Sequence, residues 1–309
     1  MRKNQFLQPA GAWLVTGAAV MWGTIGVTTQ AIYTLDSTSS LFINLARMLI
    51  ATPVLFLFCW RSLGPRMFHN IRRRDLMLML LSGTFLVFSQ ASYFAAIRYV
   101  GVTIATLLTL CVAPLLVTLL SVLLRLETLT ARAVIALICA LAGAVLLVGL
   151  QTPTGAEANL LLGTVFAMLA AITYACMLLC GRFLAAEYHP LQVNVIAFSA
   201  GTVVLVVLNL LGNVTVTHTA GGWLLLVYLG LVPTALAYWL FQMGLRSVPA
   251  TAASIMMMLD PVVAALLAWL LFGEALAVTG IAGAGLLLFS ILLLTLDHRK
   301  GTALPASAS

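Results

Sequence analysis

The residues best suited to chemistry are an acid and a base that stand within apolar stretches. Asp260 interrupts SIMMMLDPVVAALLAWLLFGEAL (254–276), directly before Pro261, and Arg47 lies in INLARMLIATPVLFLF (43–58). A carboxylate in such a setting exchanges a proton or holds a cation, and a guanidinium binds a carboxylate through two hydrogen bonds. The structural alternatives are a pair with a buried cation or hydroxyl for Asp260, and snorkelling or a fixed ion pair for Arg47. A pairing of the two with each other is a further alternative.

Polar and aromatic side chains at helical spacing form a second group of candidates. Thr106 and Thr109 share one helical face with Ala113, and the corresponding face later in the chain holds Met256 and Asp260. A cavity lined by aromatic rings and a few polar groups suits a small amphipathic ligand. For each residue taken singly, ordinary packing between helices is the alternative. The further candidates for binding are Trp22, Gln90, Tyr93, Tyr174, Tyr238 and Gln242.

The remaining reactive residue types exclude several classes of site. The four histidines are scattered, and the five cysteines show no metal-ligand or paired spacing, so the sequence predicts neither a metal site nor a cofactor. There is no phosphate-binding loop G-x-x-x-x-G-K-[ST], and no H-E-x-x-H motif or nucleophile–base cluster supports an intramembrane enzyme. The net charge of +7 is assigned to loops rather than to nucleic-acid binding, because no basic stripe with interleaved aromatics is present.

Composition identifies the elements that must position these residues. The chain is 63% hydrophobic and 7% charged, whereas soluble domains are about a quarter charged. Its apolar stretches of about 20 residues match the length needed to cross a ~30 Å hydrocarbon layer. The sequence therefore predicts an all-α membrane protein with ten transmembrane helices, at 11–32, 40–60, 76–97, 102–124, 131–150, 158–180, 190–211, 219–243, 250–272 and 278–296.

The distribution of basic residues predicts the orientation of these helices. With the N-terminus inside, thirteen of the 15 lysines and arginines fall at cytoplasmic ends, while Arg98 lies outside and Arg47 within a span. Because positive residues collect on the cytoplasmic side, both termini are predicted to be cytoplasmic. The predicted location is the cytoplasmic (inner) membrane.

The chain also repeats itself. TLCVAPLLVTLLSVLLRLETL (109–129) resembles MMMLDPVVAALLAWLLFGEAL (256–276) at an offset of 147 residues, which carries Pro114 onto Pro261. Two five-helix repeats are predicted, at 9–150 and 157–297, followed by a disordered cytoplasmic tail at 298–309. Because five is odd, the second repeat is inverted relative to the first, which is typical of secondary transporters with a binding site near the bilayer midplane. A duplication would also suit a membrane scaffold.

Smaller features predict local structure. Pro114 and Pro261 are expected to break their helices, and Pro261 leaves the Met257 carbonyl free for a ligand or water. Glu127 and Glu274 are each expected to cap the next helix. Small residues in the fifth and last spans favour close helix packing or a dimer contact: Ala136, Ala140, Gly143, Gly280, Gly283, Ala284 and Ser290.

Together, these features resemble the drug/metabolite transporter superfamily, and specifically its ten-helix EamA family. The resemblance runs from MWGTIGV (21–27) to TGIAGAGLLLFSILLL (279–294) and includes Arg47 and the proline of the fourth and ninth spans. The first repeat departs from it, with RLETL where the second has FGEAL. The resemblance implies export or exchange of small metabolites, commonly amino acids and related compounds, through a cavity between the halves. It identifies neither the solute nor the coupling ion.

The sequence therefore predicts a secondary transporter, a monomer or homodimer, that exports or exchanges a small organic metabolite by alternating access at a midplane cavity. Asp260 is the candidate for proton coupling. The alternatives are a passive channel or facilitator, and a membrane scaffold without active transport.

Overall fold

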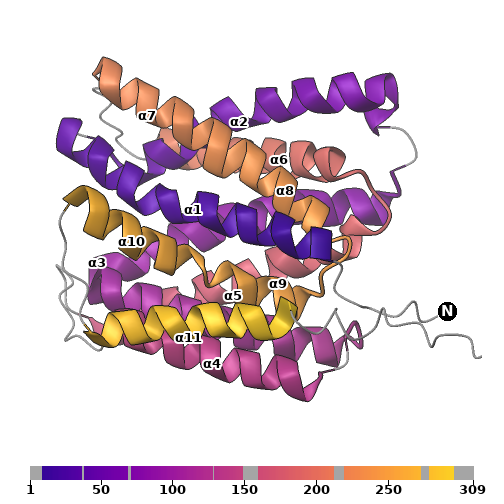
Figure 1. The fold of residues 1–309 in the computed structure, drawn as a ribbon. Coiled ribbons are helices and arrows are strands. Elements are labelled where there is room, and N and C mark those ends of the chain that lie inside the picture. Colours follow the sequence, from indigo (N-terminus) through magenta and orange to yellow (C-terminus); the bar gives the residue numbers. More distant parts are fainter. Residues whose placement is uncertain are drawn as a thin grey trace, which may run out of the picture.

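A computed structural model describes residues 9–36, 38–68, 71–127, 129–148, 159–211, 219–272 and 278–295. Within these ranges every regular element is helical (Figure 1). The elements are α1 (Pro9–Leu35), α2 (Ser40–Leu63), η1 (Gly64–Phe68), α3 (Arg73–Leu123), α4 (Ala131–Val148), α5 (Leu160–Ala185), α6 (Pro190–Leu211), α7 (Ala220–Gly230), η2 (Leu231–Leu236), α8 (Ala237–Gly244), α9 (Ala250–Met257), α10 (Asp260–Phe272) and α11 (Val278–Thr295).

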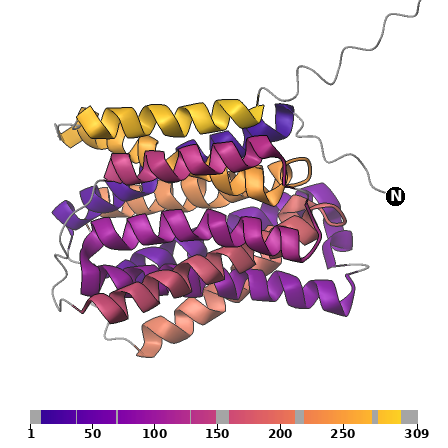
Figure 2. The same ribbon diagram turned by 90° about the horizontal axis from the view of Figure 1, so that it is seen from below.

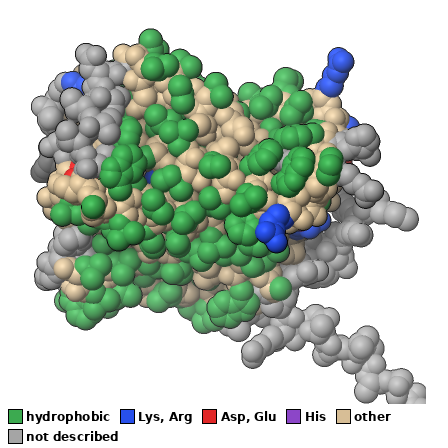
Figure 3. All heavy atoms as spheres, turned by 90° about the horizontal axis from the view of Figure 1, so that it is seen from above, with side chains coloured by type: hydrophobic (Ala, Val, Ile, Leu, Met, Phe, Trp, Pro, Cys, Tyr) green, Lys and Arg blue, Asp and Glu red, His purple; other side chains and the backbone are tan. Residues whose placement is uncertain are grey.

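Ten helical stretches of the described chain are long and apolar enough to cross a membrane, which confirms the predicted number. Large side chains on the outside of the bundle are apolar, such as Leu161 and Leu210, which are 75% and 80% exposed. Figure 3 shows one face covered largely by hydrophobic side chains, with the largest groups of basic atoms near its right-hand end. Such a surface is suited to lipid rather than to water.

The third and fourth spans belong to one continuous helix that turns back on itself. They occupy Arg73–Val100 and Ile104–Leu123 of α3. In a straight helix, Tyr93 and Thr106 would be about 20 Å apart along the axis, yet their hydroxyl oxygens are 2.6 Å apart. The two spans therefore lie side by side and are joined by a reversal around residues 101–103.

The two prolines predicted to break helices have different effects. The break expected at Pro114 is absent, because α3 continues through this residue. The ninth span is interrupted at Met258 and Leu259, between α9 and α10 and just ahead of Pro261. There the N–H groups of Met258 and Leu259 donate to carbonyls three residues back, at distances of 3.1 and 3.2 Å. Pro261 has no N–H to donate to the Met257 carbonyl, so a regular α-helical bond cannot form at this point.

The eighth span is also irregular. It consists of α7, the π-helical turn η2 and α8, with Pro233 inside the turn. A π turn often marks a functional position, because the extra residue redirects the side chains near it. Here the turn contains Thr234, whose hydroxyl donates to the Leu229 carbonyl five residues back, at 2.6 Å.

Small residues pack α4 against α11, which lie together at one side of the bundle (Figures 1 and 2). A Cβ atom at Gly143 would lie 2.8 Å from the Gly283 carbonyl oxygen, and one at Gly283 would lie 2.5 Å from that of Gly143. Ala136, Ala140 and Ser290 are fully buried near the same contact. These residues therefore serve packing within the chain, and this face is not available for the alternative of a dimer contact.

Basic residues gather at one end of the bundle, which we call the basic end. It comprises the described ends of α2, α5 and α8 and the starts of α3, α4, α6 and α9, with Arg61, Arg72, Arg125, Arg182 and Arg246. Contacts between segments hold this end together. Arg182 donates to the Leu245 carbonyl at 2.6 Å, and the Tyr188 hydroxyl donates to Asp75 at 2.7 Å.

Glu127 corrects one local prediction. Its carboxylate accepts hydrogen bonds from the backbone N–H groups of Ala250 and Thr251, so it caps α9 rather than the next helix, α4. The hydroxyl of Thr130 accepts from Ala133 N at 3.2 Å and caps α4 instead. Sequence order suggested the nearest helix start, but the fold brings a helix from the other half of the chain closer. Glu274 lies outside the described residues, as does the predicted tail at 298–309.

Candidate functional site

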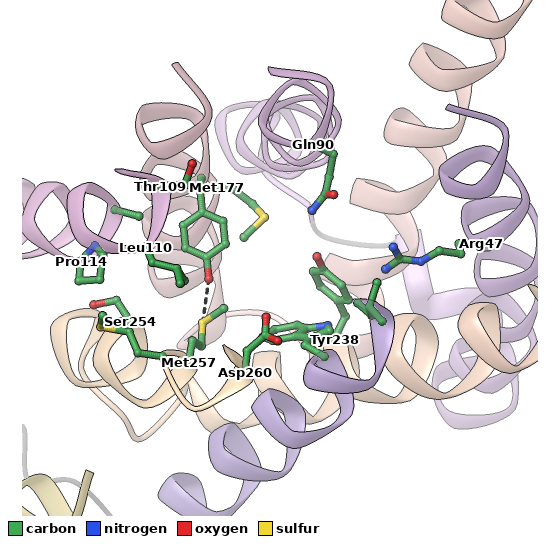
Figure 4. A pocket seen from close by; sticks show the side chains of 15 residues that line it. Arg47, Gln90, Thr109, Leu110, Pro114, Met177, Tyr238, Ser254, Met257 and Asp260 are labelled. Atoms are coloured by element: carbon green, nitrogen blue, oxygen red, sulfur yellow. Dashed lines mark hydrogen bonds between the residues drawn. The ribbon is translucent and has the colours of Figure 1, made fainter. Parts of the chain in front are cut away.

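A cavity of about 160 Å³ lies within the bundle, lined by seven helices. Most of its wall is apolar, and its polar groups come from separate elements (Figure 4). The predicted site residues that line it are Trp22, Arg47, Gln90, Thr109, Tyr174, Tyr238 and Asp260, together with Pro114. The fold thus brings together candidate side chains from seven of the ten predicted spans.

Five other predicted residues are not among those that line this cavity. Tyr93 and Thr106 hydrogen-bond to each other beside it. Met256 is fully buried in the apolar core, Gln242 lines a separate smaller cavity, and Pro261 follows Asp260 without reaching the wall. Their part in binding stays a prediction.

Arg47 is held in place by neighbouring polar side chains. It is only 8% exposed; its Nε donates to the Thr234 hydroxyl at 3.0 Å, and one terminal nitrogen donates to the side-chain oxygen Oδ1 of Asn44 at 3.4 Å. Thr234 occupies the π turn η2, so the irregular eighth span fixes the guanidinium. These bonds use part of a group with five N–H donors, while the guanidinium also faces the cavity (Figure 4).

Asp260 reaches the cavity from the start of α10. Among the residues that the structure describes, no cation lies within ion-pair distance of its carboxylate, so it does not pair with Arg47. Figure 4 shows the two side chains entering from different directions, with the Tyr238 phenol between them in this view. As the first residue of α10, Asp260 lies at the positive end of a helix dipole, which stabilises a negative charge.

The interruption of the ninth span determines which of its residues face the cavity. These are Ser254, Met257, Met258 and Asp260. In an unbroken helix, positions 258 and 260 would point in nearly opposite directions, because successive residues are 100° apart. The break brings both to one wall. The spacing of a regular helix favours Met256 over its neighbours, which is why Met257 and Met258 were not predicted.

Gly23 places the first span directly against this interruption. A Cβ atom at Gly23 would lie 2.8 Å from the Asp260 carbonyl oxygen and 2.5 Å from the Cβ of Val263. Only glycine therefore allows α1 to approach the first turn of α10 this closely. The neighbouring Trp22 lines the cavity from the same helix, so the WGT stretch positions both a wall residue and the acid.

Two polar atoms of the cavity wall have no partner within the described part of the chain. They are the indole Nε1 of Trp22 and the hydroxyl of Thr109, both buried. Buried polar groups in folded proteins are nearly always hydrogen-bonded to protein, water or ligand. Unsatisfied groups at a cavity wall therefore favour a bound polar molecule.

Aromatic rings pack against one another where α1 and α8 line the cavity. The ring of Tyr238 makes edge contacts with Trp22 and Phe198, with centroids 4.9 and 5.0 Å apart, and Trp22 makes a similar contact with Phe241 at 5.2 Å. On another wall, the Tyr174 hydroxyl donates to the sulfur of Met257 at 2.9 Å, the dashed line in Figure 4. Met177 also lines the cavity and was not predicted, although its spacing of three residues from Tyr174 indicates a shared face.

Comparison with protein families gives two matches along the chain. The model described as the EamA-like transporter family matches residues 9–149 and again residues 161–296.

Within the described residues, no group of three His, Cys, Asp or Glu side chains is arranged to hold a metal ion.

Similar proteins are found in distant organisms. An uncharacterized transporter of Archaeoglobus fulgidus is 29% identical over 89% of this chain and 93% of its own length. The uncharacterized transporter YxxF of Bacillus subtilis is 30% identical over 83% of this chain and 81% of its own length. The uncharacterized inner membrane transporter YicL of Salmonella typhimurium is 29% identical over 92% of this chain and 94% of its own length.

A solved crystal structure has the same fold. It aligns with a TM-score of 0.78 over 95% of this chain and 99% of its own, at 19% sequence identity. With ten membrane-spanning stretches and family matches over both halves, the chain is a multi-pass membrane protein and belongs to the EamA-like transporter family.

Proposed function

We propose that this protein is a secondary transporter of the cytoplasmic membrane that exports or exchanges a small amino acid or a related solute by alternating access. The main support is the cavity, where Arg47 and Asp260 face the same space without pairing with each other. Charged side chains inside a membrane are costly and typically mark a substrate or ion pathway. The family membership supports the same class of activity.

The arrangement of charges favours a zwitterionic solute. Arg47 would bind the carboxylate of the solute, and Asp260 would bind its ammonium group. The unsatisfied Trp22 Nε1 would donate to the carboxylate, and the apolar wall would contact a short side chain. The volume of about 160 Å³ lies below the roughly 300–1,000 Å³ of pockets for drug-sized ligands. A small amino acid fits these constraints better than a drug or a nucleoside.

Alternating access would move the two repeats against each other around this cavity. We propose that they are inverted relative to each other and that the basic end is cytoplasmic, as the distribution of arginines favours. We propose that the Tyr238 ring, which contacts Trp22 and Phe198, separates the cavity from the basic end in this conformation. Export would require Tyr238 to move so that the solute can reach the cavity from the cytoplasm.

Counterflow in proteoliposomes tests the proposal. Vesicles loaded with one amino acid at high concentration should accumulate the same labelled amino acid from outside. A passive channel would give flux without counterflow stimulation, and a scaffold would give no flux, so either result would reject the transporter. A panel of small amino acids, each also measured by thermal shift, identifies the solute, because a ligand that binds only the folded state raises its stability.

Proton coupling at Asp260 is tested separately with an imposed pH gradient. Asp260→Asn keeps the shape of the side chain but cannot exchange a proton. We expect the variant to lose accumulation driven by the gradient, and its counterflow to be slower because the amide lacks the negative charge that would bind the ammonium group of the solute. If Asp260→Asn still accumulates solute in response to the gradient, Asp260 is not the coupling group.

A further inference from the structure

A second cavity, of about 20 Å³, lies beside the main one and has no role in the binding scheme proposed above. It is lined by residues of α3, α5, α6 and α8, and its polar side chains are Ser82, Asn194 and Gln242. Met177 and Tyr238 line both cavities. These two residues therefore lie between the two cavities.

The second cavity lies on the side of the basic end. Gln242 is two residues from the end of α8, Gly181 is four residues from the end of α5, and Asn194 is four residues after the start of α6. All three of these helix termini belong to the basic end. A solute that moved from the main cavity toward this end would pass Tyr238 and meet the second cavity next.

The polar groups of the second cavity are not fully satisfied. Asn194 is 5% exposed, and its side-chain Nδ2 is buried with no partner in the described part of the chain. Gln242 donates through Nε2 to the Gly181 carbonyl at 2.8 Å, which leaves its side-chain oxygen as an acceptor. A buried water needs about 10–15 Å³ and two to four polar partners. The cavity meets both requirements for one water molecule.

The walls of this cavity differ in how far they can move. A Cβ atom at Gly83 would lie 1.8 Å from the Ala197 carbonyl oxygen, so α3 and α6 are in backbone contact here. Tyr238, in contrast, packs through its side chain, with ring contacts to Trp22 and Phe198. Opening is therefore easier at the phenol ring than between α3 and α6.

We propose that Ser82, Asn194 and Gln242 form a second binding site, which holds a water molecule in this conformation and receives the polar group of the solute on its way to or from the basic end. Rotation of the Tyr238 ring joins the two cavities into one path. This inference rests on the proposed transport function and adds a relay position to it.

Cysteine labelling tests whether this site becomes accessible to solvent. In a chain whose five cysteines (Cys59, Cys111, Cys139, Cys176 and Cys180) are replaced by alanine, Asn194→Cys and Ser82→Cys are introduced one at a time and reacted with N-ethylmaleimide. Ser290→Cys is the matched control, since Ser290 is fully buried between helices away from both cavities. We expect labelling of the two site variants to be at least about tenfold faster than that of the control, because their thiols are exposed whenever the Tyr238 ring moves aside.

The outcome separates this inference from the transport proposal. If the cysteine-free chain carries out counterflow while Asn194→Cys and Ser82→Cys react no faster than Ser290→Cys, the second site is rejected. If no solute shows counterflow but both site variants are labelled rapidly, the transport proposal fails and the solvent-accessible site stands.

A transport measurement on the chain with its native cysteines gives an independent test. Asn194→Leu removes the polar group and fills the cavity, and we expect it to slow counterflow about tenfold. Asn209→Leu is the control: it changes the same residue type in the same helix, but Asn209 bonds to the carbonyls of Leu41 and Leu205 and lines neither cavity. Equal counterflow by the two variants contradicts the relay site.

Discussion

The fourth and ninth spans come from similar sequences, yet only one of them is interrupted. The fourth, Ile104–Leu123, continues as a helix through Pro114, whereas the ninth, Ala250–Leu271, breaks at Met258 and Leu259. The offset of 147 residues places Ala113 opposite Asp260 in the alignment. Both residues line the cavity. The two spans therefore form comparable walls of the cavity. The wall from the fourth span is a regular helix without charge, whereas the wall from the ninth span carries an acid at a helix break.

This difference shows that a proline alone does not interrupt a membrane helix. Each span has one at the equivalent position, but only the ninth has an ionisable residue directly before it. An acid is stabilised at the N-terminus of a helix, where unpaired N–H groups carry positive partial charge. A new helix start at Asp260 supplies such an N-terminus inside the membrane. We infer that the acid and the break stabilise each other.

Moving the acid from the ninth span to the fourth gives the largest expected effect. Asp260→Ala should lower gradient-driven transport about a hundredfold, because it removes the carboxylate proposed to bind the solute and to exchange a proton. The double variant Asp260→Ala with Ala113→Asp should not recover, because an acid on an uninterrupted helix lacks the N–H groups at the start of α10. Initial rates of uptake into proteoliposomes measure both.

Recovery of at least half of the native rate by the double variant would show that the break is dispensable and that only the charge in the cavity matters. Size-exclusion profiles in detergent control for loss of folding.

Replacing the two prolines in turn gives the next largest effect. Pro261→Ala restores an N–H that can donate to the Met257 carbonyl, so the ninth span can close into a regular helix and turn Asp260 away from the wall. We expect counterflow to fall about thirtyfold. Pro114→Ala is the control, with counterflow within about twofold of the native rate, because α3 is already continuous there. A similar loss in both variants would contradict a special role for the break.

Much of the fold could be predicted from the sequence because lipid imposes simple rules. Helix length and hydrophobicity give ten spans, and the structure has ten such stretches in the described chain. Side chains such as Arg47 and Asp260 stand out because charge is rare in these stretches. Both line the same cavity, as a shared site requires.

The details that were missed depend on contacts distant in sequence. Met258 faces the cavity only because the helix is interrupted, and periodicity assumes a regular helix. Glu127 caps α9, which begins more than a hundred residues later. The Tyr93–Thr106 hydrogen bond depends on a reversal inside α3. The sequence predicts the break at Pro261 and the change of direction between the third and fourth spans, but it does not show which side chains these features bring together.

The contact between the first span and the break should have a smaller effect. Gly23→Ala places a methyl group against Val263 and the Asp260 carbonyl, which should cost about 1–3 kcal/mol of stability and slow counterflow about tenfold. Gly17→Ala is the matched control on the same helix, since nothing lies within 4 Å of its added Cβ. The control should be neutral or up to about 1 kcal/mol more stable, because alanine favours helix. Equal melting temperatures for the two variants would show that α1 can move to accommodate the added methyl group without loss of stability.

The smallest effect is expected where the fourth span supports the ninth. Glu127 is only 9% exposed and accepts from two N–H groups at the start of α9. Glu127→Gln removes the charge and leaves one acceptor, so the free energy of unfolding should fall by about 1–2 kcal/mol. Glu187→Gln is the control, because this side chain is 57% exposed and pairs with Arg72 at 3.4 Å, a contact worth at most about 1 kcal/mol. Denaturant titration in detergent measures the free energy of unfolding of both variants. An equal loss in Glu187→Gln and Glu127→Gln would show that the cap from Glu127 does not stabilise α9.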